Sequence, residues 1–297
     1  MATIAFGAAL SHSPLMNFPI SKDHEQLERF KLAVQGLAAQ LSETKPDVLV
    51  VFGPDHFRTL FFDLMPAFVI GSGKVAGWGD WDTPSGPFAT KPDLAQHILE
   101  HVLQDGFEPA FSRDLKVDHG ITQPIQLMNF EETAILPIVI NAAGKPLPMP
   151  SRCHAFGASV GRAIASFPED LRVAVLASGG LSHDPPAPSD ENALHGRTNG
   201  FAGNRGRESA LMNRVAALQA RINPDWDRMV LSHFAAGSAK ALASNLTTES
   251  IFEAAGSGGQ EIRTWIALAA TLGDPRMNVV CYEPIEALIT GMGVIST

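Results

Sequence analysis

Short runs of Val and Ile alternate with amphipathic stretches along almost the whole chain, and this alternation limits the possible folds more than any other feature. Such runs are typical of buried strands, because a strand that is covered on both faces needs an apolar residue at nearly every position. We expect buried strands at Thr3–Leu10, Asp47–Phe52, Phe68–Gly71, Ala134–Ile140, Val173–Ala177 and Met277–Tyr282.

The stretches between these runs have helical periodicity. Apolar residues recur at helical spacing in Glu25–Leu41, Pro92–Leu103, Ala155–Ala165 and Glu261–Leu272, and Gly273 is well placed to end the last helix. Alternating strands and helices favour an α/β fold, a central, mostly parallel or mixed sheet with helices on both faces. We expect one domain over residues 1–297, with an excursion at about 185–229 that is rich in Pro and Gly.

Composition excludes several classes of function. The net charge is −9 and no basic run occurs, so nucleic acid is not an expected partner. The sequence shows neither a secretory signal at its start nor an apolar run of membrane-spanning length. Two cysteines, Cys153 and Cys281, give neither a disulfide framework nor a metal-thiolate motif. We therefore expect a cytoplasmic protein with no membrane partner.

Four histidines follow candidate strands, each within a short turn-forming motif: His12, His56, His119 and His183. In α/β proteins, ligands bind in the crevice beyond the carboxyl ends of the strands, so these side chains can meet there. The turns Ser11–Pro14 and Gly53–His56 fix the backbone direction, which favours His12 and His56 as metal ligands. Histidine is also the usual acid or base near neutral pH, a role that suits His119 and His183 beside a metal.

A third metal ligand is needed, and Glu261 is the best candidate. Two histidines and one carboxylate form the facial triad of non-haem Fe(II) oxygenases, which leaves coordination positions open for substrate and oxygen. Glu261 opens an apolar helix directly after Gly258 and Gly259. A carboxylate at a helix start also interacts favourably with the helix dipole, and the residues alone do not decide between the two interpretations.

A competing motif predicts a different enzyme. His97, Glu100 and His101 match the H-x-x-E-H pattern of inverted zinc peptidases, and their spacing places both histidines on one side of a helix. The helix is explained without metal, since its apolar residues form the buried face and the histidines flank the polar one. A zinc hydrolase is therefore the less favoured alternative.

Five motifs in one order resemble those of a known family. They are Ser11-His12-Ser13-Pro14, Pro54-Asp55-His56, Val117-Asp118-His119-Gly120, Gly179-Gly180-Leu181-Ser182-His183 and Glu261-Ile262-Arg263-Thr264-Trp265. Together they resemble the class III extradiol ring-cleaving dioxygenases, the family of the protocatechuate 4,5-dioxygenase β subunit. The similarity spans nearly the whole chain.

The resemblance implies a role for each motif. It makes His12, His56 and Glu261 the ligands of Fe(II), His183 the catalytic base and His119 the catalytic acid, with Asp118 and Pro185 at positions that the family treats as catalytic or supporting. It also implies a three-layer α/β/α sandwich and a homo-oligomer.

The resemblance also implies a substrate class. The partners would be a catechol and O2 in the catabolism of aromatic compounds, and the nearest likeness is to members that cleave catechols with a carboxylated side chain, such as 2,3-dihydroxyphenylpropionate. Another catechol or an aminophenol, and a metal-binding homologue without activity, are the alternatives. Arg58 and Lys116 are candidates to meet a substrate carboxylate, although surface salt bridges are the simpler interpretation of both.

Overall fold

The computed structural model describes residues 1–20, 22–185, 194 and 221–297. Nine strands within these residues form one mixed sheet, in the order β4-β3-β6-β2-β7-β1-β9-β8, with β5 pairing with β3. The strands are β1 (Thr3–Leu10), β2 (Val48–Gly53), β3 (Phe68–Gly77), β4 (Pro87–Phe88), β5 (Ala110–Val117), β6 (Ala134–Ile140), β7 (Arg172–Ser178), β8 (Asn278–Ile285) and β9 (Thr290–Ser296).

The centre of the sheet is parallel, the flank of β9 and β8 is antiparallel, and the flank of β3, β4 and β5 is mixed. Strands β1, β7, β2 and β6 run parallel, so that Val50 of β2 lies between Val175 of β7 and Leu136 of β6. Strand β9 pairs antiparallel with β1, and β3 pairs antiparallel with β6. The carboxyl ends of the four parallel strands therefore lie together at one edge.

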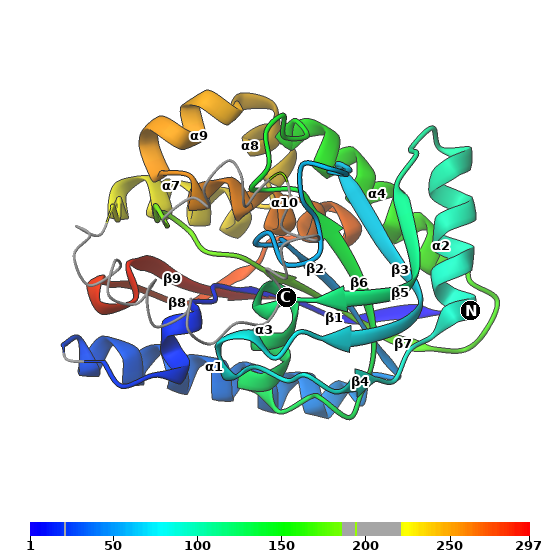
Figure 1. Cartoon of the computed structure of the whole chain (residues 1–297), viewed down its shortest axis with the longest axis horizontal. Coiled ribbons are helices and arrows are strands. Elements are labelled where there is room, and N and C mark those ends of the chain that lie inside the picture. The colour runs from blue at the N-terminus through cyan, green and yellow to red at the C-terminus, as the bar shows by residue number, and fades with distance from the viewer. Residues whose placement is uncertain (21, 186–193, 195–220) are drawn as a thin grey trace.

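Helices cover both faces of the sheet, which confirms the predicted α/β class and its three layers (Figure 1). Helices α1 and α3 lie on one face, and α2, α4 and α7 to α10 lie on the other. The helices are α1 (His24–Thr44), α2 (Pro92–Gln104), α3 (His119–Met128), α4 (Pro150–Ser166), α7 (Pro224–Ala235), α8 (Ala239–Asn245), α9 (Thr248–Ala255) and α10 (Ile262–Thr271), with short 3-10 turns η1 (Pro14–Asn17), η2 (Asp80–Asp82), η3 (Gly258–Glu261) and η4 (Glu286–Leu288).

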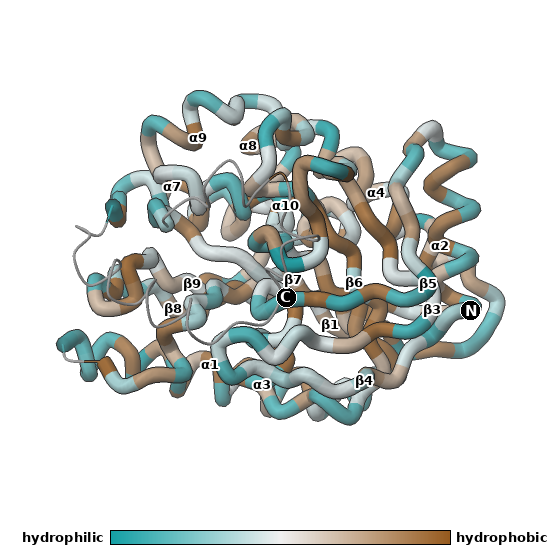
Figure 2. The backbone as a smooth tube through the Cα atoms, in the orientation of Figure 1, coloured by the Kyte–Doolittle hydropathy of each residue, from teal (hydrophilic) through white to brown (hydrophobic). Residues whose placement is uncertain are grey.

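The central strands have apolar side chains on both faces because helices cover both. In β2, Val48, Val50 and Phe52 pack in the core under α4 and α10, whereas Leu49 and Val51 pack against α1 and α3. Figure 2 shows the matching hydrophobic colour along these strands. Nearly continuous apolar runs are the sequence signature of such double burial.

Several boundaries differ from those expected. The strand predicted at 277–282 begins at Asn278 on the sheet edge, and Val279 and Val280 are each 42% exposed, so the prediction that it is buried was wrong. Helix α10 begins at Ile262, because Glu261 belongs to the preceding turn η3. Most of the excursion expected at 185–229 lies outside the described residues. Of the helices in the described part of the chain, none is long and apolar enough to cross a membrane.

Candidate metal centre and active site

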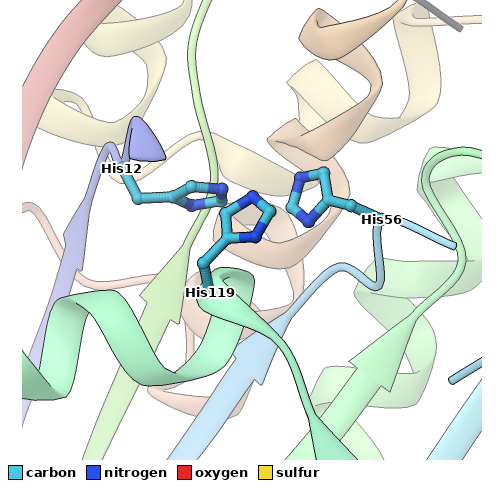
Figure 3. Close-up of side chains that lie close together, drawn as sticks. All are labelled: His12, His56 and His119. Atoms are coloured by element: carbon cyan, nitrogen blue, oxygen red, sulfur yellow. The ribbon is translucent and has the colours of Figure 1, made fainter. Parts of the chain in front are cut away.

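Three of the four predicted histidines meet beyond the carboxyl ends of the strands (Figure 3). His12 lies two residues past β1, His56 three past β2, and His119 opens α3 directly after β5. One ring nitrogen from each lies within 4.8 Å of the others. The ring of His12 is perpendicular to that of His56, with centroids 5.2 Å apart, whereas the rings of His56 and His119 stack at 4.1 Å with planes 22° apart.

The outer nitrogen of each of these rings has its own partner. His12 Nδ1 lies 2.9 Å from Ser178 Oγ, and His56 Nδ1 lies 3.0 Å from Asp118 Oδ2. Such contacts fix the ring orientation and leave Nε2 as the free ligand atom, as they do around histidines that bind metals.

Glu261 joins this centre from the turn η3, just before α10. Its Oε1 lies 3.1 Å from His56 Nε2 and 3.7 Å from His183 Nε2, and its Oε2 accepts a hydrogen bond from the Gly180 backbone at 2.7 Å. The side chain makes no capping bond to α10. Its carboxylate therefore faces the histidines rather than the helix start, which favours the interpretation as a ligand.

The electrostatic environment differs among the three proposed ligands. Burial lowers the pKa of His12 to about 3, so this imidazole is neutral at pH 7. Burial alone would raise the pKa of Glu261, but His183 and the hydrogen bond from His56 outweigh it and hold the pKa well below its usual range. Burial opposes a charge on His56 too, yet Asp118 and Glu261 raise its pKa well above the ordinary value. The two carboxylates thus stabilise a positive charge at this position.

Backbone groups of three residues hold His183 in place. Its Nδ1 lies 3.1 Å from the carbonyl oxygen of Leu181, which assigns the proton to Nδ1 and leaves Nε2 as an acceptor. Its backbone N–H donates to Ala255, and its carbonyl accepts from Gly258. A Cβ at Gly258 would lie only 2.2 Å from the His183 ring, so a glycine is needed for this approach.

A buried network that the sequence did not reveal supports the turn before His183. Asp227 of α7 accepts hydrogen bonds from the Ser182 N–H at 2.8 Å, the Ser182 hydroxyl at 2.7 Å and the Tyr282 hydroxyl at 2.6 Å. Pro185, two residues beyond His183, is half-buried and ends this described stretch of chain.

The aspartates near the site pair differently from their order in the sequence. Asp118 binds His56 rather than its neighbour His119, through the His56 backbone N–H at 2.6 Å and the ring nitrogen. His119 Nδ1 instead lies 2.7 Å from Asp80 Oδ2. Asp55, next to His56, caps a turn by accepting backbone hydrogen bonds at residues 58, 59 and 60.

Both candidate cations are engaged elsewhere. Arg58 is buried and pairs with Asp80 at 3.3 Å, so its interpretation as a surface salt bridge was wrong. Lys116 lies 4.3 Å above the ring of Trp78. To bind a substrate carboxylate, each would have to give up its present partner.

The competing zinc motif does not assemble. His97 Nε2 lies 2.9 Å from Ser166 Oγ, and His101 Nε2 lies 3.6 Å from Asp105 Oδ2. Glu100 points to solvent and accepts a hydrogen bond from Gln96. In the described part of the chain, the side-chain groups able to hold a metal include none of the three motif residues.

The fold and the site first define a class: an α/β enzyme whose histidines and carboxylates gather beyond the carboxyl ends of its parallel strands. A family model described as the catalytic LigB subunit of aromatic ring-opening dioxygenase matches residues 7–293. The chain belongs to this family and is a ring-cleaving dioxygenase.

Curated relatives cover nearly the whole chain. Proteins named 2,3-dihydroxyphenylpropionate/2,3-dihydroxicinnamic acid 1,2-dioxygenase are 36% identical in Photorhabdus laumondii and in Rhodococcus jostii, each over 96% of this chain and 95% of the relative. One from a Rhodococcus species is 35% identical over 96% of both chains. The crystal structure of an uncharacterized Escherichia coli K12 protein, 14% identical, matches over 98% of this chain and 99% of that chain with a TM-score of 0.50, which bears on the fold alone.

Proposed function

We propose that this protein cleaves a catechol with a carboxylated side chain, such as 2,3-dihydroxyphenylpropionate, at the ring bond beside its two hydroxyl groups, using O2 and Fe(II). The meeting of the buried His12 and Glu261 with the half-buried His56 in one centre carries the proposal. The printed names of the relatives support the substrate class. A homo-oligomer stays a prediction that light scattering on the purified protein can test.

The donor set fits a divalent metal, and we assign His12, His56 and Glu261 as its ligands. A lone pair of imidazole lies in the plane of the ring, and a metal–nitrogen bond is only about 2.0–2.1 Å long. The perpendicular rings of His12 and His56 can direct their Nε2 atoms at one ion. His119 is also close enough to be a ligand, and we assign the third position to Glu261 because a carboxylate beside two histidines completes the donor set of a non-haem Fe(II) site. Two histidines and one carboxylate leave coordination positions open for substrate and oxygen.

Fe(II), when bound, would hold the catechol oxygens and O2 together and pass electron density between them. The protein's own groups move the protons. His183 takes the proton of a catechol hydroxyl at Nε2, because its Nδ1 already donates to Leu181. His119 supplies a proton as the ring opens, and Asp118 keeps His56 oriented. Pro185 limits the chain just beyond His183 and so supports its position. Both oxygen atoms enter the ring-opened product.

The test is anaerobic reconstitution with Fe(II), followed by O2 uptake and absorbance with 2,3-dihydroxyphenylpropionate, protocatechuate, gallate and 2-aminophenol. We expect one O2 per substrate and a yellow ring-fission product, fastest with the first compound. His12→Ala and Glu261→Ala should lose iron and activity together, whereas His119→Ala and His183→Ala should keep iron and lose turnover. No O2 uptake by fully iron-loaded protein would contradict the proposal. A preference for 2-aminophenol would change the proposed substrate class from catechols to aminophenols.

A further inference from the structure

Asp80 is a buried carboxylate that the proposed chemistry does not yet use. It opens the short turn η2, between β3 and β4, and is 2% exposed. Its two oxygens bind the same residue: Oδ1 accepts the His119 backbone N–H at 3.1 Å, and Oδ2 lies 2.7 Å from His119 Nδ1. The carboxylate therefore hydrogen-bonds to both the backbone and the ring of His119, and Nε2 is left facing the centre.

A buried cation supports Asp80 in turn. Arg58 Nε lies 3.3 Å from Asp80 Oδ2, and the Arg58 side chain is only 9% exposed. A buried carboxylate needs such a partner, because removing one member of a buried pair leaves the other charge uncompensated. The Thr83 hydroxyl adds a contact of 3.5 Å to Oδ1. Asp80 thus has donors on both oxygens.

The backbone around Asp80 is strained and tightly held. Trp81 and Asp82 have φ of 56° and 57°, a left-handed backbone conformation that residues other than glycine rarely adopt. Asn17 donates to the carbonyl of Trp81, and Gln126 of α3 donates to that of Asp82. Backbone strain persists where surrounding contacts enforce it, and it gathers at functional sites. Here the enforced conformation presents Asp80 to His119.

We propose that Asp80, held by Arg58, is a positioning residue that fixes the ring and the tautomer of His119 for its role as a proton carrier. Asp80 fixes the Nδ1–H tautomer and holds the His119 ring in its stack on His56, so that Nε2 is the atom left to carry a proton at the centre. This inference rests on the proposed function, since it assigns the proton role of His119.

The two aspartates then have separable duties despite serving stacked rings. Asp118 orients His56, a proposed ligand, so its loss should weaken metal binding. Asp80 orients His119, so its loss should slow turnover and leave the metal in place. Asp118 and His119 are neighbours in the sequence, but in the structure Asp118 pairs with His56 and Asp80 pairs with His119.

The experiment compares Asp80→Asn, Asp118→Asn and the control Asp105→Asn. The two bonds to His119 use different oxygens of Asp80, and Asn has only one acceptor oxygen, so Asp80→Asn cannot keep both bonds in their present geometry. Asp105 also accepts two side-chain hydrogen bonds, from Ser159 and Arg162, but lies at the end of α2, away from the histidines. Each variant is measured for iron content, kcat and KM, and for ¹⁵N histidine shifts in the zinc-substituted protein, which report the ring tautomers.

In Asp80→Asn we expect a full metal complement, KM within about threefold, kcat lower by about 10²-fold and an altered tautomer signal for His119. Arg58→Gln should give the same pattern more weakly, and it serves as the second variant if Asp80→Asn does not fold. Asp105→Asn should match the wild type. Loss of metal in Asp80→Asn would overturn the proposal, because His119 would then act as a ligand, and so would an unchanged kcat or an unchanged His119 tautomer. The tautomer and metal measurements remain decisive if no catechol is turned over, so a failure of the proposed function is seen separately.

Discussion

Helices α4 and α10 approach so closely that two glycines of α4 have no room for a side chain. A Cβ at Gly157 would lie 2.1 Å from the carbonyl oxygen of Ala267, and one at Gly161 would lie 2.3 Å from that of Thr271. Real Cβ contacts do not fall below 3.0 Å, so Gly157→Ala must separate the helices by roughly 1 Å. It would also strain the hydrogen bond from the Thr271 hydroxyl to the Gly157 carbonyl.

The expected cost follows from two opposing effects. Alanine is favoured over glycine in a helix by about 1 kcal/mol, whereas overpacking a tight contact costs about 1–3 kcal/mol or more, and here the clash is with rigid backbone. Because the clash is with backbone, we take the upper end of the overpacking cost, about 3 kcal/mol, and subtract the helix gain of about 1 kcal/mol. We therefore expect Gly157→Ala to lower the free energy of unfolding by about 2 kcal/mol. Because α10 begins directly after Glu261, the displaced helix should also lower iron occupancy.

Gly36 provides the matched control. It lies on the exposed face of α1, and a Cβ there would meet nothing within 4 Å, so Gly36→Ala should stabilise by about 0.5–1 kcal/mol. Urea unfolding of the metal-free proteins, followed by circular dichroism at equal concentration, measures both variants. A Gly157→Ala protein as stable as Gly36→Ala would refute the argument from helix approach.

Three further results are expected. Asp118→Asn should weaken Fe(II) binding about 10–100-fold by releasing His56, as measured by competition with a chelator. Burial raises the pKa of the Cys153 thiol from 9.0 to about 12, so the folded protein should resist thiol reagents until urea exposes it. Because the folded thiol holds its proton more tightly than the unfolded one, the contribution of Cys153 to stability should fall as the pH rises from 9 towards 12. Tyr282→Phe removes a hydrogen bond to the buried Asp227 carboxylate and should cost about 1.5–3 kcal/mol in urea unfolding, without loss of iron.

The central fold was predictable because hydrophobic periodicity reports burial directly. Strands β1, β2, β6 and β7 are apolar at nearly every position, and each was expected within a residue or two of its observed bounds. Strands β5 and β9 were missed for opposite reasons. Strand β5 lies near the edge of the sheet, and charged residues interrupt its apolar pattern. Strand β9 is buried, but it contains Gly291 and Gly293, which pack against Asp227 and Leu181 and give no strand signal.

The site was predictable as far as its local motifs allowed. His12, His56 and His183 follow the parallel strands β1, β2 and β7, whose carboxyl ends lie at one edge. His119 follows β5, which runs antiparallel to these strands because it pairs parallel with β3 and β3 pairs antiparallel with β6. The parallel topology therefore accounts for three of the four positions. Helix α3, which begins at His119, was not expected, since its sequence contains Gly120 and Pro124. Asp80 carried one weak signal, an acidic residue among Gly79, Trp81 and Asp82 after a strand, and its partner lies 39 positions away.

Burial and the partner of Nδ1 set the charge and the tautomer of these histidines, and both depend on tertiary structure. Burial keeps His12 uncharged, with the Ser178 hydroxyl as the neutral partner of its Nδ1, while the Asp118 carboxylate favours positive charge at His56, where an ion would be held. A backbone carbonyl fixes the tautomer of His183 without adding charge, which suits a base. Histidines in similar motifs can therefore serve different roles, because burial and the partner of the outer nitrogen set the charge and the tautomer of each imidazole.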